Sequence, residues 1–158
     1  MSEKIVINSG PLIALGKMQA LDLIAQLPYE FLCPSQVETE ILKGTSLGYS
    51  VVIPSWVKVL SLQSPLAPFA SIALDDGEAS VIQLALEQKI SRVCIDELKG
   101  RRAALAVGLQ VVGSLGLLGN AKTRGLIPAA RPFIEQAQQN GIYYDANLVD
   151  RFLRAIGE

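Results

Sequence analysis

The chain has 158 residues, of which 50% are hydrophobic and 18% charged, so it can bury a full core and is not expected to be disordered. It contains no histidine, which excludes a Ser-His-Asp triad, a Cys-His dyad and a zinc site built on imidazole. Its 14 basic and 15 acidic residues give a net charge of −1, so any contact with nucleic acid must come from a local patch. We expect a single domain over residues 1–158.

Apolar runs and turn residues predict an alternation of short strands and helices. The β-branched run Ile5–Ile7 is typical of a buried strand, the turn Asn8–Gly10 ends it, and Pro11 suits the first turn of a helix. In chain order, strands are expected at residues 5–7, 31–33, 93–95 and 109–112. Helices are expected at residues 11–18, 21–27, 34–43, 75–86, 98–107, 113–121, 129–140 and 145–156.

The pattern is weaker from Thr45 to Ala73. Val51–Ile53 and Trp56–Leu60 look extended there, and prolines between them favour loops. Because the other strands are short and show no alternation of polar and apolar residues, they indicate a parallel sheet that helices cover on both faces. The sequence therefore predicts an α/β fold, a three-layer α/β/α sandwich with a short parallel sheet.

The cysteines and the N-terminal segment indicate in which cellular compartment the protein is expected. Cys33 and Cys94 lie within apolar runs, so we expect buried, reduced thiols and no zinc site. Glu3 and Lys4 precede a short apolar run that polar residues interrupt, which does not resemble a signal peptide. No stretch of the sequence reaches the ~18 uninterrupted apolar residues of a membrane span. We expect a soluble, cytoplasmic protein that does not enter a membrane.

Polar side chains follow two of the predicted strands. Asn8 ends the first strand and Asp96 ends the strand at 93–95, and ligands of open parallel sheets gather beyond such carboxyl ends. Glu78 begins the helix that leads into the Asp96 strand, so it joins the same rim. Glu38 and Glu40 lie on a helix that should flank the first strand, and their spacing of two lets at most one of them face the cleft.

These residues form a set of hard oxygen donors. Carboxylates and an amide oxygen in one cleft would attract Mg²⁺ or Mn²⁺. Such an ion activates water and neutralises charge on a phosphate, so the set points to metal-assisted cleavage of a phosphodiester without histidine. Each residue also has a purely structural explanation. A lone Asp at a strand end is commonly a helix N-cap, acids at a helix start complement its dipole, and acid pairs on a helix often form a solvated face.

At these residues the sequence resembles the PIN domains, a family of metal-dependent ribonucleases that includes the toxins of bacterial toxin–antitoxin pairs. The segments that carry the resemblance are Ile5–Leu15, Pro34–Ile41, Asp76–Ala79 and Cys94–Glu97. Arg101-Arg102 and Gly113–Gly116 are further marks, and they are typical of a little-characterised bacterial branch of the family. The resemblance runs from about Ile5 to about Asp150, and residues 45–73 match poorly.

The resemblance implies a site and its cofactor. Glu40, Glu78 and Asp96 would hold Mg²⁺ or Mn²⁺, and with Asn8 they are the candidate catalytic residues. Asn8 stands where most of the family has Asp. An amide offers one neutral oxygen but does not supply the charge, which weakens the attraction for the metal. We expect Asn8 to orient metal-bound water. Asp145, in the C-terminal region, is a weaker candidate for a further acid.

The function that the resemblance implies is a metal-dependent endoribonuclease, the toxin of a toxin–antitoxin pair. Its partners would be an RNA substrate, a small antitoxin protein and a second copy of the chain. An alternative is a catalytically weak PIN-like module that binds RNA or a protein partner without cleavage, which Asn8 favours. A third, a small-molecule-binding domain, is disfavoured because Gly113, Gly116 and Gly119 do not have the Gly-x-Gly-x-x-Gly spacing.

Basic and aromatic residues are candidates for contact with RNA. Lys99, Arg101 and Arg102 closely follow Asp96 and could grip a phosphate backbone, although a solvated helix face explains them equally well. Lys122 and Arg124 would extend this patch.

Three further expectations concern aromatic residues and the geometry of the site. Tyr49 and Trp56 could stack on bases, but packing in the core or in an interface is the simpler reading. The regions around Trp56 and Phe152 are candidates for the dimer surface. We expect Asn8 to lie beside Asp96, and Glu40 rather than Glu38 to face the cleft.

Overall fold

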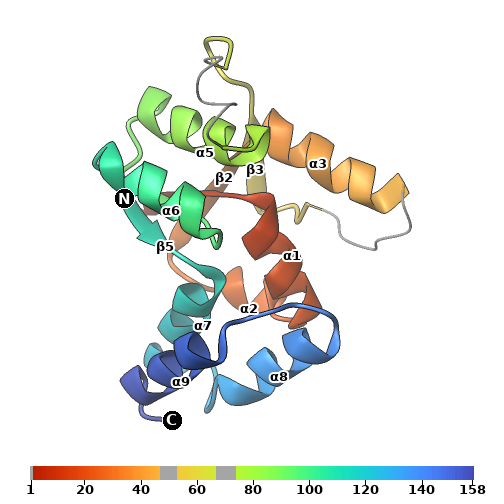
Figure 1. The fold of residues 1–158 in the computed structure, drawn as a ribbon, viewed down its shortest axis with the longest axis vertical. Coiled ribbons are helices and arrows are strands. Elements are labelled where there is room, and N and C mark those ends of the chain that lie inside the picture. Colours follow the sequence, from red (N-terminus) through yellow and green to blue (C-terminus); the bar gives the residue numbers. More distant parts are fainter. Residues whose placement is uncertain (1, 47–52, 67–73) are drawn as a thin grey trace.

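The structure is a computed structural model, and it describes residues 2–46, 53–66 and 74–158 (Figure 1). Its strands are β1 (Glu3–Ile7), β2 (Tyr29–Pro34), β3 (Val57–Leu60), β4 (Arg92–Cys94) and β5 (Gln110–Val112). Its helices are α1 (Ser9–Lys17), α2 (Leu21–Ile24), α3 (Ser35–Ser46), α5 (Asp76–Glu87), α6 (Leu98–Ala106), α7 (Ser114–Thr123), α8 (Arg131–Gln139) and α9 (Ala146–Ala155).

The strands form one parallel sheet in the order β3-β2-β1-β4-β5. Helices α5 and α6 pack against one side of it, and α1, α2 and α7 pack together on the other, while α3 contacts both α1 and α5 (Figure 1). This confirms the three-layer α/β/α sandwich. The strand β3 lies within the segment 56–60 that looks extended in the sequence. The expected extension at Val51–Ile53 falls largely on residues 51 and 52, which lie outside the described residues.

The centre of the sheet is fully buried, and its composition explains why. Ile5, Val6 and Ile7 in β1 have no solvent exposure, because helices cover both faces of this central strand. Cys33 and Cys94 are buried free thiols, as the sequence predicts. Burial, with a smaller contribution from the charge of Glu38, raises the pKa of Cys33 to about 12, and burial raises that of Cys94 well above its usual value.

The glycines of α7 serve close packing. A Cβ at Gly116 would lie 2.6 Å from Cγ2 of Val112, and one at Gly119 would lie 2.9 Å from Cε1 of Phe152. The absence of side chains therefore lets β5 and α9 approach α7 closely. This spacing is a packing feature, in agreement with the rejection of a dinucleotide fingerprint.

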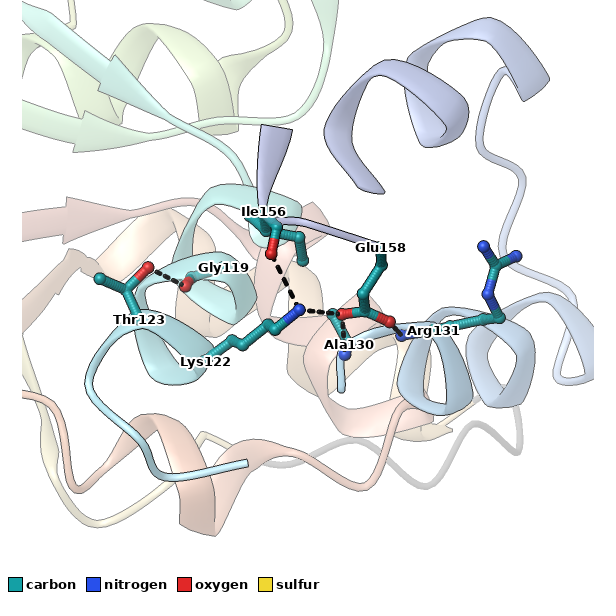
Figure 2. A network of polar contacts seen from close by, with 7 residues as sticks. All are labelled: Gly119, Lys122, Thr123, Ala130, Arg131, Ile156 and Glu158. Atoms are coloured by element: carbon teal, nitrogen blue, oxygen red, sulfur yellow. Dashed lines mark hydrogen bonds and ion pairs between the residues drawn. The ribbon is translucent and has the colours of Figure 1, made fainter. Parts of the chain in front are cut away.

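A polar network fastens the C-terminal residues to α7 and α8 (Figure 2). Lys122 of α7 donates to the carbonyl oxygen of Ile156 at 2.9 Å and lies 3.1 Å from Oε2 of Glu158. The Glu158 carboxylate also accepts the backbone N–H groups of Ala130, at 2.6 Å, and Arg131, at 3.2 Å, where α8 begins. Lys122 thus has internal partners, which accounts for it without contact to RNA.

Two aromatic residues that were candidates for a dimer surface pack within the chain. The rings of Trp56 and Phe31 meet edge to face with their centroids 5.3 Å apart. Phe152 packs against the Gly119 position of α7. These internal contacts account for the apolar character of Trp56 and Phe152. Tyr49 lies outside the described residues. No helix in the described part of the chain is long and apolar enough to cross a membrane.

Candidate functional site at the carboxyl edge of the sheet

Asn8 and Asp96 follow adjacent parallel strands. Ile7 of β1 pairs with Cys94 of β4, and the backbone N–H of Asn8 donates to the carbonyl oxygen of Cys94 at 3.0 Å. Asp96 comes two residues after that carbonyl. Both residues therefore lie at the same edge of the sheet, as the sequence predicts.

Asn8 occupies the N-cap position of α1, but its side chain does not cap the helix. It is only 5% exposed, and within the described residues its Oδ1 has no hydrogen-bond partner. Asparagine is a favoured N-cap because its side-chain oxygen normally accepts a helix N–H. Since Asn8 does not do this, helix capping does not explain the residue, and a buried oxygen without a partner calls for another explanation.

Glu78 lies in the first turn of α5, whose N-cap is Asp75. The backbone N–H of Glu78 donates to Oδ1 of Asp75 at 2.7 Å, while the Glu78 side chain is 5% exposed and packs against Gly100 of α6. Its Oε2 is also buried without a hydrogen-bond partner among the described residues. Burial, with the neighbouring Asp75, raises the pKa of Glu78 to about 7. A solvated acid that merely complements the helix dipole would be exposed, so that explanation fails.

Glu40 joins these residues from α3. The hydroxyl of Ser9 donates to Oε2 of Glu40 at 2.7 Å, and the same carboxylate packs over Gly77, next to Glu78. Glu40 is exposed, so it lies at the outer side of the group. Glu38 lies instead near Cys33, whose pKa its charge raises. Glu40, rather than Glu38, therefore contacts the residue next to Asn8, and that Glu40 faces a metal cleft stays a prediction.

Asp96 is held by the start of α7. Its Oδ1 accepts the backbone N–H of Ser114 at 2.8 Å, and its Oδ2 accepts the Ser114 hydroxyl at 2.9 Å. A Cβ at Gly113 would lie 2.9 Å from both Oδ1 of Asp96 and Nη1 of Arg101, so only glycine leaves room for this approach. Burial raises the pKa of Asp96 above its usual value, against the opposing effects of Ser114 and Arg101.

Ser114 is a residue of the site that sequence reasoning missed. It is fully buried, and its hydroxyl lies between Asp96 and the hydroxyl of Tyr144, 2.7 Å away. The available signal was the turn Gly113–Gly116 after β5, because a serine at a helix start is well placed to bond a neighbouring carboxylate. Tyr144, from a segment 30 residues further on, carried no signal.

The predicted residues are linked by contacts to neighbouring residues and do not form a closed cluster. Contacts run from Ser9 to Glu40, from Glu40 to Gly77, from Glu78 to Gly100, and from Asp96 to Gly113. Across residues 2–46, 53–66 and 74–158, however, no three acidic or cysteine side chains come close enough together to hold a metal ion. In chemical type the donors suit a hard divalent cation, and the two buried oxygens without partners have no hydrogen bond within the described residues to lose on binding one.

The basic residues differ in their surroundings. Arg101 donates through Nη1 to the carbonyl oxygen of Ile95 at 2.9 Å, beside Asp96, whereas Lys99 and Arg102 are exposed. Arg124 lies 5.9 Å from the ring centroid of Tyr29 and donates to Oδ1 of Asn120 at 2.6 Å. Internal contacts thus account for Arg124 as they do for Lys122.

A groove of about 970 Å³ opens beside Asp96. Asp96, Arg101 and Gly113 line one side of it, and residues 141–145 together with α9 residues line another. The C-terminal segment therefore forms a wall next to the site, which was not anticipated from the sequence. Asp145, also in this wall, accepts the backbone N–H of Leu148 at 3.1 Å and caps α9, which gives it a structural role.

Comparison with known proteins gives one family. A family model described as a PIN domain matches residues 4–158, nearly the whole chain. A search of curated proteins finds no significant match.

Proposed function

Because the chain belongs to the PIN-domain family, whose fold is of the nuclease type, we propose that it is a metal-dependent endoribonuclease acting at the carboxyl edge of β1 and β4. The observation that carries the proposal is the pair of buried oxygens without partners, Oδ1 of Asn8 and Oε2 of Glu78, at the rim that Asp96 shares. A polar atom left without a partner in a native interior needs an explanation, such as a catalytic role, an ordered water or a bound ion.

Glu40, Glu78 and Asp96 would hold Mg²⁺ or Mn²⁺. When bound, such an ion supplies an activated water and neutralises charge on the scissile phosphate. The chain holds the ligands in place: Ser114 bonds both carboxylate oxygens of Asp96, the positive charge of Arg101 lies near them, and the Ser9 hydroxyl bonds Glu40. Glu78, whose pKa is about 7, would release a proton when a cation binds. The amide of Asn8 would orient water through its oxygen.

The same residues imply weak cation binding. Asn8 contributes no charge, and Glu78 is partly protonated near neutral pH. We therefore expect the site to bind metal only at millimolar concentrations. RNA cleavage should be stimulated more by Mn²⁺ than by Mg²⁺, since Mn²⁺ binds such ligands more tightly.

The substrate and partners follow from the same proposal. RNA would approach the rim, and the exposed Lys99 and Arg102, with Arg101 beside Asp96, would contact its phosphates. As a toxin, the protein would act in the cytoplasm as a homodimer and be neutralised by a small antitoxin protein. A short reading frame for a DNA-binding protein next to the gene would support this role.

A second candidate function is supported by the hydrogen bonds of Asp96 and by the neutral side chain of Asn8. Both carboxylate oxygens of Asp96 already have partners in Ser114, and Asn8 is neutral. These features favour a PIN-like module that binds RNA or a protein without cutting.

Cleavage of end-labelled single-stranded RNA separates the two candidates. We expect the wild type to cut slowly in millimolar Mn²⁺ and not in EDTA, and Asp96→Asn to abolish cutting. If the wild type and Asp96→Asn are equally inactive in Mn²⁺, the nuclease proposal is wrong. RNA affinity, measured by fluorescence anisotropy, then tests the binding module.

A further inference from the structure

The hydroxyl of Tyr144 belongs to the surroundings of Asp96, although its residue lies far along the chain. Tyr144 is in the link between α8 and α9, and its hydroxyl lies 2.7 Å from Oγ of Ser114. Ser114 has no solvent exposure, so its hydroxyl depends on protein partners. Burial raises the pKa of Tyr144 above its usual value, so the phenol keeps its proton at neutral pH.

The direction of the hydrogen bonds follows from counting protons. A serine hydroxyl has one proton to donate, and that of Ser114 goes to Oδ2 of Asp96 at 2.9 Å when the carboxylate is ionised. The Ser114 oxygen must then accept from Tyr144. The donors therefore run from Tyr144 to Ser114 to Asp96, and each hydrogen bond in such a chain polarises and strengthens the next.

The segment that carries Tyr144 is fastened by contacts of its own. Phe152 of α9 packs on the Gly119 position of α7, and Glu158 bonds Lys122 and the start of α8 (Figure 2). Ser114 is the first residue of α7. The contacts that attach the C-terminal segment to α7 therefore also keep Tyr144 close to Ser114.

We propose that Tyr144 is a positioning residue that fixes the Ser114 hydroxyl and, through it, the orientation of the Asp96 carboxylate at the cation site. The cation in this statement rests on the proposed function. The donor chain itself rests on the two hydrogen bonds of Ser114 and on its complete burial. A purely structural tyrosine would stabilise the C-terminal segment without affecting Asp96.

Tyr144→Phe tests the proposal, and Tyr29→Phe is its matched control. Both substitutions remove only a hydroxyl, and each breaks one partly buried hydrogen bond, since Tyr29 accepts from Asn120 at 2.6 Å. Tyr29 begins β2, at the edge of the sheet opposite the site. We expect similar small falls in melting temperature for the two variants.

Only Tyr144→Phe should affect Asp96. Losing one hydrogen bond of ordinary strength should weaken Mn²⁺ binding, measured calorimetrically, by about threefold to tenfold. The value of kcat for RNA cleavage should fall by a similar factor, while KM stays within about twofold. In the metal-free protein, the amide resonance of Ser114, which reports its bond to Asp96, should move in Tyr144→Phe and stay in place in Tyr29→Phe.

The outcomes separate this inference from the proposed function. If the Ser114 resonance and Mn²⁺ affinity are the same in Tyr144→Phe as in Tyr29→Phe, Tyr144 is not a positioning residue. If the wild type neither binds Mn²⁺ nor cuts RNA, the proposed function is wrong. The Ser114 amide resonance of the metal-free protein then decides whether Tyr144 is a positioning residue. A shift in Tyr144→Phe then upholds the donor chain to Asp96, and no shift overturns it.

Discussion

Asn8 and Glu78 are polar side chains in positions where the fold makes no use of their buried oxygens. Neither Oδ1 of Asn8 nor Oε2 of Glu78 has a partner in the described chain, and burial of such atoms typically costs ~1–3 kcal/mol each. A cation bound by Glu78, with its water held by the Asn8 amide, would remove this cost. Adding a charge at Asn8 should therefore lower the stability of the metal-free protein, and removing the charge of Glu78 should raise it.

Asn8→Asp should strengthen the site. Two unit charges ~4 Å apart at an effective dielectric of ~20 attract by about 4 kcal/mol, and even a fraction of this, after desolvation, is a tenfold change in affinity. We expect at least about tenfold tighter Mn²⁺ binding by calorimetry and faster RNA cleavage. The same variant should be less stable in EDTA, where the added carboxylate is buried without a cation. Unchanged Mn²⁺ affinity would contradict the placement of a cation at Asn8.

Glu78→Gln should stabilise the metal-free protein at high pH. The pKa of Glu78 is about 7 in the folded chain against an ordinary value of 4.5, so the folded state holds the proton more tightly. Stability from this residue is greatest below pH 4.5, declines as the pH rises to about 7, and is constant above. Urea titrations in EDTA should show Glu78→Gln more stable than wild type by about 1–3 kcal/mol at pH 8, and no such gain at pH 4.5. A loss of stability at pH 8 would show that the ionised carboxylate has a partner in the folded protein.

At the scale of elements, the site depends on how closely α3 and α6 approach α5. The carboxylate of Glu40 packs over Gly77 of α5, and that of Glu78 packs against Gly100 of α6. Glycine at these contacts leaves the space that the two acids occupy. The acids are therefore positioned by the packing between helices as well as by their own helices.

Gly77→Ala should displace Glu40 with little effect on folding. The added methyl group would overlap the end of a flexible, exposed side chain, while alanine favours the helix by up to about 1 kcal/mol over glycine. We expect a small change in melting temperature and at least about a fivefold loss of kcat, since small misplacements at a reacting centre are costly. In Gly16→Ala the methyl would only touch Leu21, at 3.6 Å, and activity should stay at the wild-type level. Equal activity in both variants would place Glu40 outside the site.

The network of Lys122 and Glu158 should contribute measurably to stability. Hydrogen bonds from the N–H groups of Ala130 and Arg131 and from Lys122 hold the pKa of Glu158 below its usual value, although partial burial acts to raise it. Glu158→Gln should lower the free energy of unfolding in urea at pH 7 by about 1 kcal/mol. Asp150→Asn, which breaks the exposed pair with Arg154, should change it by less than about 0.5 kcal/mol. If the two variants lose the same small amount, the network is not a significant anchor.

The sequence predicted the elements well where local pattern decides. The run Ile5–Ile7 and its turn gave β1 and α1, and the polar residues at strand ends gave Asn8 and Asp96 at one edge, since parallel strands leave no other arrangement. The bonds from Ser114 to Asp96 and to Tyr144 were not predictable. They join residues 18 and 30 positions apart, and no periodicity encodes such contacts. Likewise, the sequence suggested RNA contact for Lys122 and Arg124, whose internal partners appear only in the folded chain.

For the whole molecule, the fold brings one edge of the sheet and the C-terminal segment together around a groove at Asp96. We expect two such chains to associate, as proposed for a toxin of this family. Trp56 and Phe152 are only partly buried by their internal contacts, so the regions around them stay candidates for this association. Light scattering at tens of micromolar should give about twice the 16.9 kDa of one chain. A mass equal to one chain at that concentration would contradict the dimer.

The cation site is the central element of the proposed activity, and a crystal soaked in millimolar Mn²⁺ tests it most directly. Anomalous scattering from manganese locates the ion independently of the protein atoms. We predict a peak at the carboxyl edge of β1 and β4, within coordination distance of oxygens of Glu40, Glu78 and Asp96 and close to the amide of Asn8, and no peak there in Asp96→Asn. A wild-type crystal with manganese elsewhere, or with none at this edge, would contradict the proposed site.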